Sequence, residues 1–590
     1  MLRSRYTNMG NLEMSERVVV GIDLGTTTSE ACVYREDKYK HIKSSLGKIV
    51  IPSVVGYDKD TQSIIAGDVA DSKAKGNPDN FVWEVKRSMG TEVVFELGDE
   101  KYSASEISAE TLRYIKNYCE KYYDEPINDA VITVPALFNN NQRQDTKRAA
   151  ELAGFNVERL VAEPTAAALA YCMENTDAED FVKLMVYDLG GGTFDVTVGE
   201  YHKGVLDIKG TSGDNHLGGK DFDELLAEVF HDKVVQQHGL DLRQDKFAAF
   251  TMKRACESLK KELSFQESSS INIPFLAAKD GKAISLSETF TREQFEELIM
   301  PSIEQTEKAI EGALKAAEYK ADDIDIVLLV GGSTRIPLVR QTVKKLMKSE
   351  PKADIDPDLA VSLGAAMQAA IITGESDGVI MDNVPHSFGT SAITDYNGQM
   401  ISGVYSEIIP ANASMLKPHE KKYYTVYDDQ DIIDFQVYQK PPMLESIWAE
   451  EMDYLGSKEI TGIPKNKAGE ECLTATFTYN LNGILEVQIL IDSTNQTHAF
   501  EIDAGSATDP RPALESGSNS DSEFLDWESH ELAKQYGSTI KLAEKKLADT
   551  DHDELRTKLL ELMKAICDDD SIQAEALDDE INDLLFELED

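Results

Sequence analysis

Two segments of the chain place an aspartate ahead of a glycine-rich turn that contains hydroxyl residues. GIDLGTTTS supplies Asp23, Gly25, Thr26 and Thr27, and VYDLGGGTFD supplies Asp188, Gly190, Gly191, Gly192, Thr193 and Asp195. Because glycines leave backbone N–H groups uncovered, a turn of this kind can surround a phosphate group. One such segment would be typical of an ordinary tight turn, but two in matching context indicate a phosphate site.

The spacing Asp-x-Gly followed by threonine is the same in both segments, and Asp23 and Asp188 lie 165 residues apart. We interpret the similarity as an internal duplication, in which two lobes of one ancestral fold each contribute a hairpin to a shared cleft. A nucleotide between the lobes would be held from both sides. Asp23, Asp188 and Asp195 would repel its phosphates unless a cation intervened, so these carboxylates are placed to hold a hydrated Mg²⁺.

A third glycine segment, LLVGGSTRIP, ends an apolar run at Gly331 and Gly332. Ser333 and Arg335 follow at positions from which they could approach a base and a ribose. Taken alone, this segment could also be a strand-to-helix turn, so the hypothesis of a nucleotide site depends on the first two segments.

The pattern of apolar runs divides the chain into domains. Residues 18–374 alternate strand-like runs with long amphipathic stretches, which predicts an α/β domain. After a linker at 375–384, short alternating runs joined by polar turns predict an all-β domain over 385–504. Residues 505–522 are rich in Gly, Pro, Ser and Asp and predict a flexible linker, and helix formers return over 523–590.

Composition limits the class of protein. The 590 residues include 106 acidic and 59 basic ones, for a formal charge of −47, so no basic face for nucleic acid or an anionic membrane is expected. Hydrophobic residues make up 41%, which places the charge on the surface of folded domains. Residues 1–17 have no apolar run after them, and the six cysteines lie far apart. We expect a disordered N-terminal tail, free thiols and a soluble cytoplasmic protein.

Together with ITVPALFNNNQRQDTKRAAELAG, LVAEPTAAALAY and GDNHLGGKDFD, these motifs closely resemble the 70-kDa heat-shock chaperones, the DnaK-type family. The resemblance is dense from Val18 to Ile372, weaker to about Asp492, and lost beyond Asp503. It implies an α/β actin-like, two-lobed ATPase domain of the duplicated RNase-H-like type, then an all-β sandwich that binds peptides, and a short α-helical C-terminal lid. It also implies ATP or ADP and Mg²⁺ as bound groups, with K⁺ as a further candidate.

The resemblance assigns roles to matching positions. Lys86 matches the lysine near the γ-phosphate and the attacking water, and Glu163 matches the glutamate that organises Mg²⁺ and water. Considered alone, Lys86 would be taken for a solvated lysine and Glu163 for a helix N-terminal acid. Asp188, Thr193 and Asp195 complete the catalytic set. The remaining matches form the adenosine pocket and its glycine turns: Gly218, Glu257, Lys260, Lys261, Ser264, Gly331, Gly332, Ser333, Arg335 and Asp358.

Pro135 and Arg143 match residues through which the family relays the nucleotide state to its second domain, although a turn proline and a surface arginine would give the same sequence. Three departures from the family pattern are evident. Thr28 follows the two threonines where relatives often have Asn or an aromatic residue. PALF stands where relatives have PAYF, which puts Leu137 in place of a tyrosine. Lys261 stands where many relatives have an arginine that stacks on adenine, and an ammonium stacks less well, so we expect a lowered adenine affinity.

The second domain is expected to bind an extended apolar peptide. The apolar linker from Gly378 to Asp382 is expected to dock into a groove in one state. VPHSFGTSAI and FTYNLNGILEVQ resemble the start and a late hairpin of the peptide-binding sandwich. A loose alignment gives Met400, Tyr427 and Ile433 as candidate pocket residues, each of which could instead be a core residue. The bulk of Tyr427 is expected to narrow the arch over the channel.

The C-terminal segment from Asp521 to Asp590 carries 22 acidic and 7 basic residues, most of them expected on a solvated helix face. It is too short for the full lid of the family, a truncation that resembles specialised members of the HscC type and predicts fast client exchange. One apolar helical stripe is expected to pack within the segment rather than bind a partner; it consists of Leu577, Ile581, Leu584, Leu585 and Leu588.

The expected function is that of an ATP-dependent molecular chaperone which couples ATP binding and hydrolysis to the binding and release of unfolded or extended polypeptides. The resemblance implies a J-domain co-chaperone and a nucleotide exchange factor as partners. Two alternatives stay open. The chain could be a regulator that binds one dedicated protein, or another actin-like protein such as a small-molecule kinase or a filament-forming ATPase.

Overall fold

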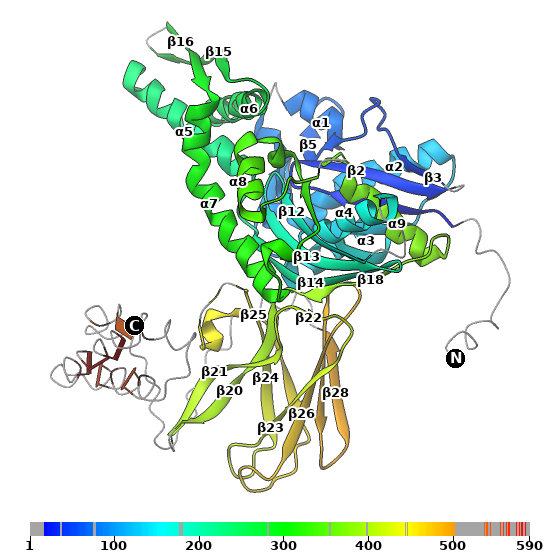
Figure 1. Ribbon diagram of the computed structural model, residues 1–590, viewed down its shortest axis with the longest axis vertical. Coiled ribbons are helices and arrows are strands. Elements are labelled where there is room, and N and C mark those ends of the chain that lie inside the picture. The colour runs from blue at the N-terminus through cyan, green and yellow to red at the C-terminus, as the bar shows by residue number, and fades with distance from the viewer. Residues whose placement is uncertain are drawn as a thin grey trace.

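The computed structural model describes residues 17–501 apart from short gaps, together with scattered helical positions between 536 and 585. An α/β domain forms the upper part of the molecule and a β domain lies beneath it (Figure 1). The expected N-terminal tail up to residue 16 and the linker at 505–522 lie outside the described residues. The gaps are at 36–37, 75–77, 176–180, 280–281, 353–355, 397–398, 443 and 445.

The first half of the α/β domain contains a sheet whose main path runs β11-β10-β1-β2-β3. β1 and β2 form an antiparallel hairpin, and β1, β10 and β11 are parallel neighbours. β1 and β10 are buried on both faces, as is typical of parallel strands that helices cover. The strands are β1 (Val19–Leu24), β2 (Thr28–Arg35), β3 (Lys38–His41), β10 (Asp129–Val134) and β11 (Asn156–Ala162).

The second half repeats this layout. β12 and β13 form an antiparallel hairpin that β14 extends, and β17 pairs in parallel with β12. The glycine turns after Asp23 and Asp188 therefore connect equivalent strands of two sheets, which supports the duplication that the motifs predict. The strands are β12 (Phe181–Leu189), β13 (Phe194–His202), β14 (Val205–Asp214), β17 (Ile326–Val330) and β18 (Val379–Met381).

Two alanine-rich helices, α4 (Glu163–Asn175) and α9 (Ala360–Thr373), lie in the core that joins the two sheets and pack against each other. Their approach is so close that a Cβ on Gly364 would lie 1.8 Å from the Ala166 carbonyl oxygen. On β1, a Cβ on Gly21 would likewise lie 2.2 Å from the α9 backbone. Small side chains at this contact fix the separation of the two halves.

The other helices cover the outer faces of the sheets. Ser103, Asn139 and Thr291 cap α2, α3 and α7 by accepting a hydrogen bond from the N–H three residues on, an interaction that stabilises a helix by about 1 kcal/mol. These helices are α1 (Gly67–Ala74), α2 (Ala104–Tyr123), α3 (Asn140–Leu152), α5 (Gly219–His238), α6 (Lys246–Leu263), α7 (Arg292–Ala316) and α8 (Pro337–Met347). Small additional strands are β4 (Ile51–Pro52), β5 (Val54–Asp58), β6 (Ser63–Ala66), β7 (Phe81–Trp83), β8 (Val94–Leu97), β9 (Glu100–Ser103), β15 (Ser268–Lys279) and β16 (Lys282–Thr291).

The β domain consists of two four-stranded sheets, β21-β20-β24-β25 and β23-β26-β27-β28, which pack face to face. Phe388, Phe435 and Phe477 alternate with outward residues on their strands and fill the space between the sheets. The strands are β19 (Asn383–Val384), β20 (Ser387–Tyr396), β21 (Gln399–Ile409), β22 (Ala413–Ser414), β23 (His419–Tyr424), β24 (Ile432–Lys440), β25 (Asp453–Thr461), β26 (Cys472–Tyr479), β27 (Leu485–Ile491) and β28 (Gln496–Glu501).

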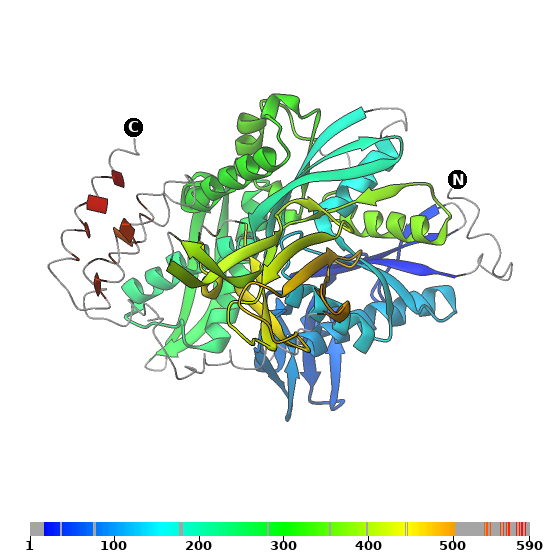
Figure 2. The same ribbon diagram turned by 90° about the horizontal axis from the view of Figure 1, so that it is seen from below.

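The apolar linker between the domains is docked. β18 pairs in parallel with β14, with Ile380 opposite Leu206, and Ile380 is buried in the core next to α4 and α9. Figure 2, seen from below, shows the strands of the β domain lying over the α/β domain. The linker therefore extends the second sheet of the α/β domain, and β19 of the β domain follows after only one residue, Asp382.

The described positions of the C-terminal segment are helical and form one apolar cluster. Leu577, Ile581 and Leu585 are buried in this cluster, Leu584 is partly buried against it, and Trp448 of the β domain also contacts it. The expected apolar stripe thus packs within the helical segment, while Leu588 lies outside the described residues.

The five cysteines in the described part of the chain are free, and Cys32, Cys119, Cys172 and Cys256 are buried as small hydrophobic side chains. This confirms the prediction of free thiols for those positions. No helix within the described residues is long and apolar enough to cross a membrane.

The contact between α4 and α9 leads to a prediction on stability. Gly364→Ala is expected to lower the free energy of unfolding by about 1–3 kcal/mol, because the new methyl group collides with backbone that cannot move aside. Urea unfolding followed by circular dichroism measures this. Gly312→Ala in α7 is the matched control: its nearest neighbour is the Ser212 hydroxyl at 3.0 Å, which can rotate, so stability should stay equal or rise by up to about 1 kcal/mol. Equal effects of both substitutions would contradict the prediction.

Candidate nucleotide site

The two glycine turns face each other between the halves of the α/β domain. A Cβ on Gly191 would lie 2.1 Å from Thr27 Oγ1, and a Cβ on Gly192 would lie 2.7 Å from Thr26 Cγ2. Gly218, ahead of α5, comes equally close, because its Cβ would lie 2.5 Å from the Gly192 nitrogen. Because Gly191 and Gly192 have no side chains of their own, the side chains of Thr26 and Thr27 pack directly on the second turn.

Hydrogen bonds from neighbouring segments hold both turns. Ser53 Oγ donates to the Gly25 carbonyl at 2.8 Å. In the second turn, the Gly190 N–H donates to the Thr193 carbonyl at 3.1 Å, and Ser333 Oγ donates to the Gly190 carbonyl at 2.8 Å. Ser333 belongs to the third glycine segment, which the structure thus brings into contact with the second turn.

Asp23, Asp188 and Asp195 lie at the strand ends that lead into or out of these turns. Burial, and then the charge of Glu163, raises the pKa of Asp23 and of Asp195 to about 7. Burial raises the pKa of Asp188 well above its usual range, and Glu163 and the other two aspartates add to the effect. Carboxylates that disfavour one another's charge in this way favour a nearby cation.

Two of these carboxylates are oriented by hydrogen bonds. Thr133 Oγ1 donates to Asp23 Oδ1 at 2.8 Å. The N–H groups of Ala136 and Leu137 donate to the two oxygens of Asp195 at 3.2 and 3.3 Å. The loop that precedes α3 therefore contacts the site directly.

Lys86 is buried, with 4% of its side chain exposed, and forms an ion pair with Glu163. The interpretation of Lys86 as a solvated lysine is therefore wrong. Lys86 lies in the 3₁₀ helix η2 (Val85–Ser88), and Glu163 is the first residue of α4, so Glu163 is both an ion-pair partner and a helix N-terminal acid. Burial raises the pKa of the three aspartates, and the Lys86 charge opposes this effect.

The third glycine segment packs against the second turn. Gly331 has a φ of +83°, and a Cβ there would lie 2.4 Å from the Leu189 carbonyl oxygen, so only glycine fits. From α6, Lys260 Nζ donates to the Gly219 carbonyl at 2.6 Å and pairs with Asp223 at 2.7 Å. Gly331 and Lys260 thus lie beside the phosphate turns, as expected for the wall of a nucleotide pocket.

Further members of the predicted adenosine set pair with one another. Arg335 contacts Asp356 at 3.0 Å and Asp358 at 2.7 Å, and a Cβ on Gly332 would lie 3.4 Å from Asp358 Oδ1. The half-exposed guanidinium is held by two carboxylates in this state, so its plane is fixed beside the glycine segment.

Lys261 differs from its neighbours on α6. Its side chain is 67% exposed and pairs with Glu257 at 2.6 Å, one turn earlier on the helix. Ser264, at the end of α6, donates from Oγ to the Lys260 carbonyl at 3.1 Å. The Lys261 ammonium is therefore largely exposed but held by Glu257 in this state, and its weaker stacking on a base stays a prediction.

A model of the family described as Hsp70 protein matches residues 19–589, nearly the whole chain. The chain belongs to the Hsp70 family. Hsp70 proteins are ATPases that bind a nucleotide with a divalent metal ion, and they act as ATP-dependent chaperones on unfolded polypeptides together with co-chaperones. The match confirms the resemblance inferred from the motifs.

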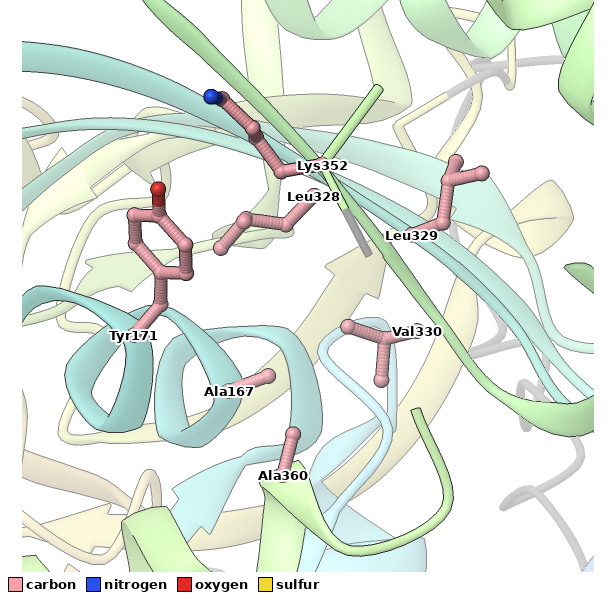
Figure 3. Close-up of a pocket in the computed structure, with 7 residues that line it drawn as sticks. All are labelled: Ala167, Tyr171, Leu328, Leu329, Val330, Lys352 and Ala360. Atoms are coloured by element: carbon pink, nitrogen blue, oxygen red, sulfur yellow. The ribbon is translucent and has the colours of Figure 1, made fainter. Parts of the chain in front are cut away.

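A small apolar hollow lies behind this Hsp70 site and has room for about one water molecule. It is bounded by α4, β17 and the start of α9 (Figure 3). It is too small for a nucleotide and belongs to the packing between the two halves. Its lining residues are Ala167, Tyr171, Leu328, Leu329, Val330, Lys352 and Ala360.

Sequence reasoning missed one buried carboxylate near the site. Glu30 on β2 is directly opposite Asp23 on β1 and is 1% exposed. In the part of the chain that the structure describes, neither of its carboxylate oxygens has a partner at hydrogen-bond distance, and Ser362 is the nearby hydroxyl. Burial, and then the Asp23 charge, raises the pKa of Glu30 well above its usual range. The signal in the sequence is an acidic residue within the apolar run SEACVY, seven residues after Asp23 across the hairpin turn.

Arg143 is buried, so its interpretation as a surface arginine is wrong. Its Nη2 donates to the Ala136 carbonyl at 3.1 Å and its Nε to the Phe138 carbonyl at 3.2 Å. Gly483 of the β domain lies so close that a Cβ there would be 2.7 Å from Arg143 Nη1. Pro135 accepts the Phe138 N–H in a turn at 3.2 Å. Arg143 thus connects the loop that holds Asp195 with the second domain.

The three candidate residues of the peptide pocket lie on different elements of the β domain. Tyr427 is 63% exposed on the connection between β23 and β24. Ile433 on β24 is half-buried and packs against the core of the sandwich. Met400 is in β21, and its side chain lies outside the described residues.

The isolated Glu30 carboxylate leads to a pH-dependent prediction. Its pKa in the folded chain is raised, so its contribution to stability is present below the unfolded pKa of about 4.5 and is lost as pH rises. Glu30→Gln has no carboxyl group to ionise, so it should raise the free energy of unfolding of the metal-free chain at pH 7. The gain should vanish near pH 4.5.

Thermal unfolding with EDTA at several pH values measures this effect. Glu96→Gln on β8 is the control, because the Glu96 side chain is 74% exposed. A pH-independent difference between Glu30→Gln and the wild type would contradict the prediction.

Proposed function

We propose that this Hsp70 protein hydrolyses ATP between its two glycine turns and couples the reaction to the binding and release of extended polypeptide segments. The observation that carries the proposal is the direct opposition of Gly191 to Thr27 and of Gly192 to Thr26. Each half of the domain contributes one turn, so bound phosphates would hold the halves together.

Transfer of a phosphoryl group to water requires mainly positioning and neutralisation of charge. Lys86 would stabilise negative charge on the phosphate. Glu163, its ion-pair partner in this state, would give up that contact when the phosphate binds and would then orient water. Asp195, fixed by the N–H groups of Ala136 and Leu137, would supply a second acceptor for the water. No covalent nucleophile is needed.

The residues present fit a hydrated Mg²⁺. Burial raises the pKa values of Asp23, Asp188 and Asp195, so a cation relieves a repulsion that exists already. Among the described residues, no three carboxylate, imidazole or thiolate side chains are close enough to bind a metal ion directly, so a cation at this site would keep water ligands. Mg²⁺ would supply neutralisation of the phosphate charge when bound.

Coupling to the β domain is supported by the docked linker and by Arg143. β18 is a strand of the α/β domain in this state, so a movement of β14 against its neighbours would act on the linker. The nucleotide must favour the docked or the undocked arrangement for coupling to exist. A J-domain co-chaperone and a nucleotide exchange factor are the partners we propose, and the cytoplasm is the proposed location.

Lys86→Ala tests the proposed hydrolysis. It should lower single-turnover ATP hydrolysis by about 10²–10³-fold, since it removes a preorganised positive group from a buried site. Lys348→Ala, which removes a 67% exposed lysine paired with Asp322, is the control and should leave turnover unchanged. Unfolded peptide should stimulate the wild type. The proposal would be contradicted if ATP turnover were unchanged both by Lys86→Ala and by the addition of unfolded peptide.

Tyr427→Ala tests the proposed peptide channel. Because Tyr427 is 63% exposed, its removal should change stability by less than about 0.5 kcal/mol. Loss of its bulk should admit larger side chains, which a peptide array would record as a changed binding profile. Phe275→Ala, which removes a 51% exposed aromatic residue from β15, is the control. Coinciding profiles for Tyr427→Ala and the wild type would count against a role in the channel.

A further inference from the structure

His386 is a buried histidine at the boundary between the two domains. It lies in the β domain two residues after β19, is 4% exposed, and its Nε2 is 2.9 Å from the carbonyl oxygen of Leu137 in the α/β domain. A carbonyl can only accept, so the ring carries its proton on Nε2. Its Nδ1 is buried and has no hydrogen-bond partner among the described residues.

The Leu137 peptide joins His386 to the nucleotide site. The Leu137 N–H donates to Asp195 Oδ1 at 3.3 Å, while its carbonyl accepts from His386 and also from Asn215 Nδ2 at 2.8 Å. A single residue therefore contacts an aspartate of the proposed catalytic set on one side and the second domain on the other. The docked β domain helps to fix the loop that orients Asp195.

A charged imidazolium does not fit this position. Arg143 of α3 is the charged side chain that acts on the ring, and it has the same sign as a protonated histidine would have. Burial, opposed by the hydrogen bond to Leu137 and assisted by the charge of Arg143, lowers the pKa of His386 to about 4. Asp382, the nearest acid on the same segment, is partly buried and interacts with Arg159 and Arg143 instead.

We propose that His386 is a positioning residue which ties the docked β domain to Asp195 through the Leu137 peptide, and that only its neutral form supports docking. Undocking would expose the ring to water, where its ordinary pKa of about 6.5 applies. The pKa is lower in the docked state, so docking is fully supported above about pH 6.5 and is weakened as pH falls toward 4. Between pH 7.5 and 5.5 the docking equilibrium should shift about tenfold.

Asp195, whose pKa of about 7 lies within this window, titrates both in the wild type and in the variant compared with it below. The remaining groups at the boundary respond in the opposite direction to His386 or do not titrate between pH 7.5 and 5.5. Burial raises the pKa of Asp382 in the docked state, so the protonation of this carboxyl at lower pH favours docking. Arg143 and Arg159 stay charged throughout. The effect of His386 is therefore isolated by comparing the wild type with His386→Gln, whose amide can keep an N–H donor near Nε2 and does not titrate.

The experiment follows amide hydrogen exchange of β18 in the full chain at pH 7.5 and 5.5. In the docked state the Val379 N–H donates to the Gly204 carbonyl at 3.0 Å, so its protection factor reports docking. Protection in the wild type should fall about tenfold more than in His386→Gln over this range. His498→Gln is the matched control, because His498 also contacts a backbone carbonyl, that of Thr461 at 3.1 Å, but within the β domain.

ATP turnover separates positioning from simple packing. His386→Leu has no hydrogen-bond donor, so it should weaken β18 protection at both pH values and lower kcat several-fold with an unchanged KM for ATP. At pH 5.5, His386→Gln should have higher β18 protection and a higher kcat than His386→Leu. The turnover measurement rests on the proposed function, whereas the hydrogen-exchange measurement does not. Docking could therefore still be tested by hydrogen exchange if the chain had no ATPase activity. The same pH response in wild type and His386→Gln, or normal docking and kcat in His386→Leu, would overturn the inference.

Discussion

The burial of several carboxylates around Lys86 is the constraint on which the rest of the structure depends. Like charges in a poorly solvated site cost several kcal/mol each unless protons or cations neutralise them. Here strands hold the three aspartates and Glu30 together, and the start of α4 holds Glu163 beside them. Lys86 offsets only part of this charge. The free energy of bringing the two halves together therefore depends on the protons or cations that neutralise these carboxylates. The arrangement in which the halves are in contact is thus sensitive to a bound cation and nucleotide.

The same constraint reaches the second domain through one short loop. Residues 135–138 orient Asp195 by two backbone N–H groups, and two of their carbonyls, those of Ala136 and Phe138, accept from Arg143. Arg143 in turn lies against Gly483. A change in the charge or position of Asp195 must move this loop, and the loop cannot move without disturbing the packing of the β domain. Site and domain boundary are thus coupled by backbone geometry rather than by a chain of flexible side chains.

How much of this could be predicted from the sequence depends on the range of the interaction. Asp23, Asp188 and the glycine turns form local patterns, and the repeated spacing led to the duplicated fold. Glu30 is opposite Asp23 in the hairpin, so the pairing rule for antiparallel strands could have predicted its place next to the site. The role of His386 could not be predicted from the sequence, because its partner Leu137 is 249 residues away and the contact joins two docked domains. The burial of Arg143 depends in the same way on a domain boundary that a linear pattern does not define.

Amide side chains make up much of the contact between the domains, and this chemistry suits the reversible docking that we propose. Asn482 Oδ1 accepts the Leu160 N–H at 3.2 Å, Gln439 Oε1 accepts the Asn140 N–H at 3.1 Å, and Asn412 Oδ1 accepts the Thr211 N–H at 2.9 Å. Each of these hydrogen bonds can be exchanged for one to water when the domains separate, so each has a net value of only about 1 kcal/mol. An apolar boundary of the same size would stay closed, and one built from ion pairs would leave buried charges uncompensated. Because the amides do not titrate, the pH response of docking depends on the ionisable groups around them, which are His386 and Asp382 at the boundary and Asp195 next to the Leu137 peptide.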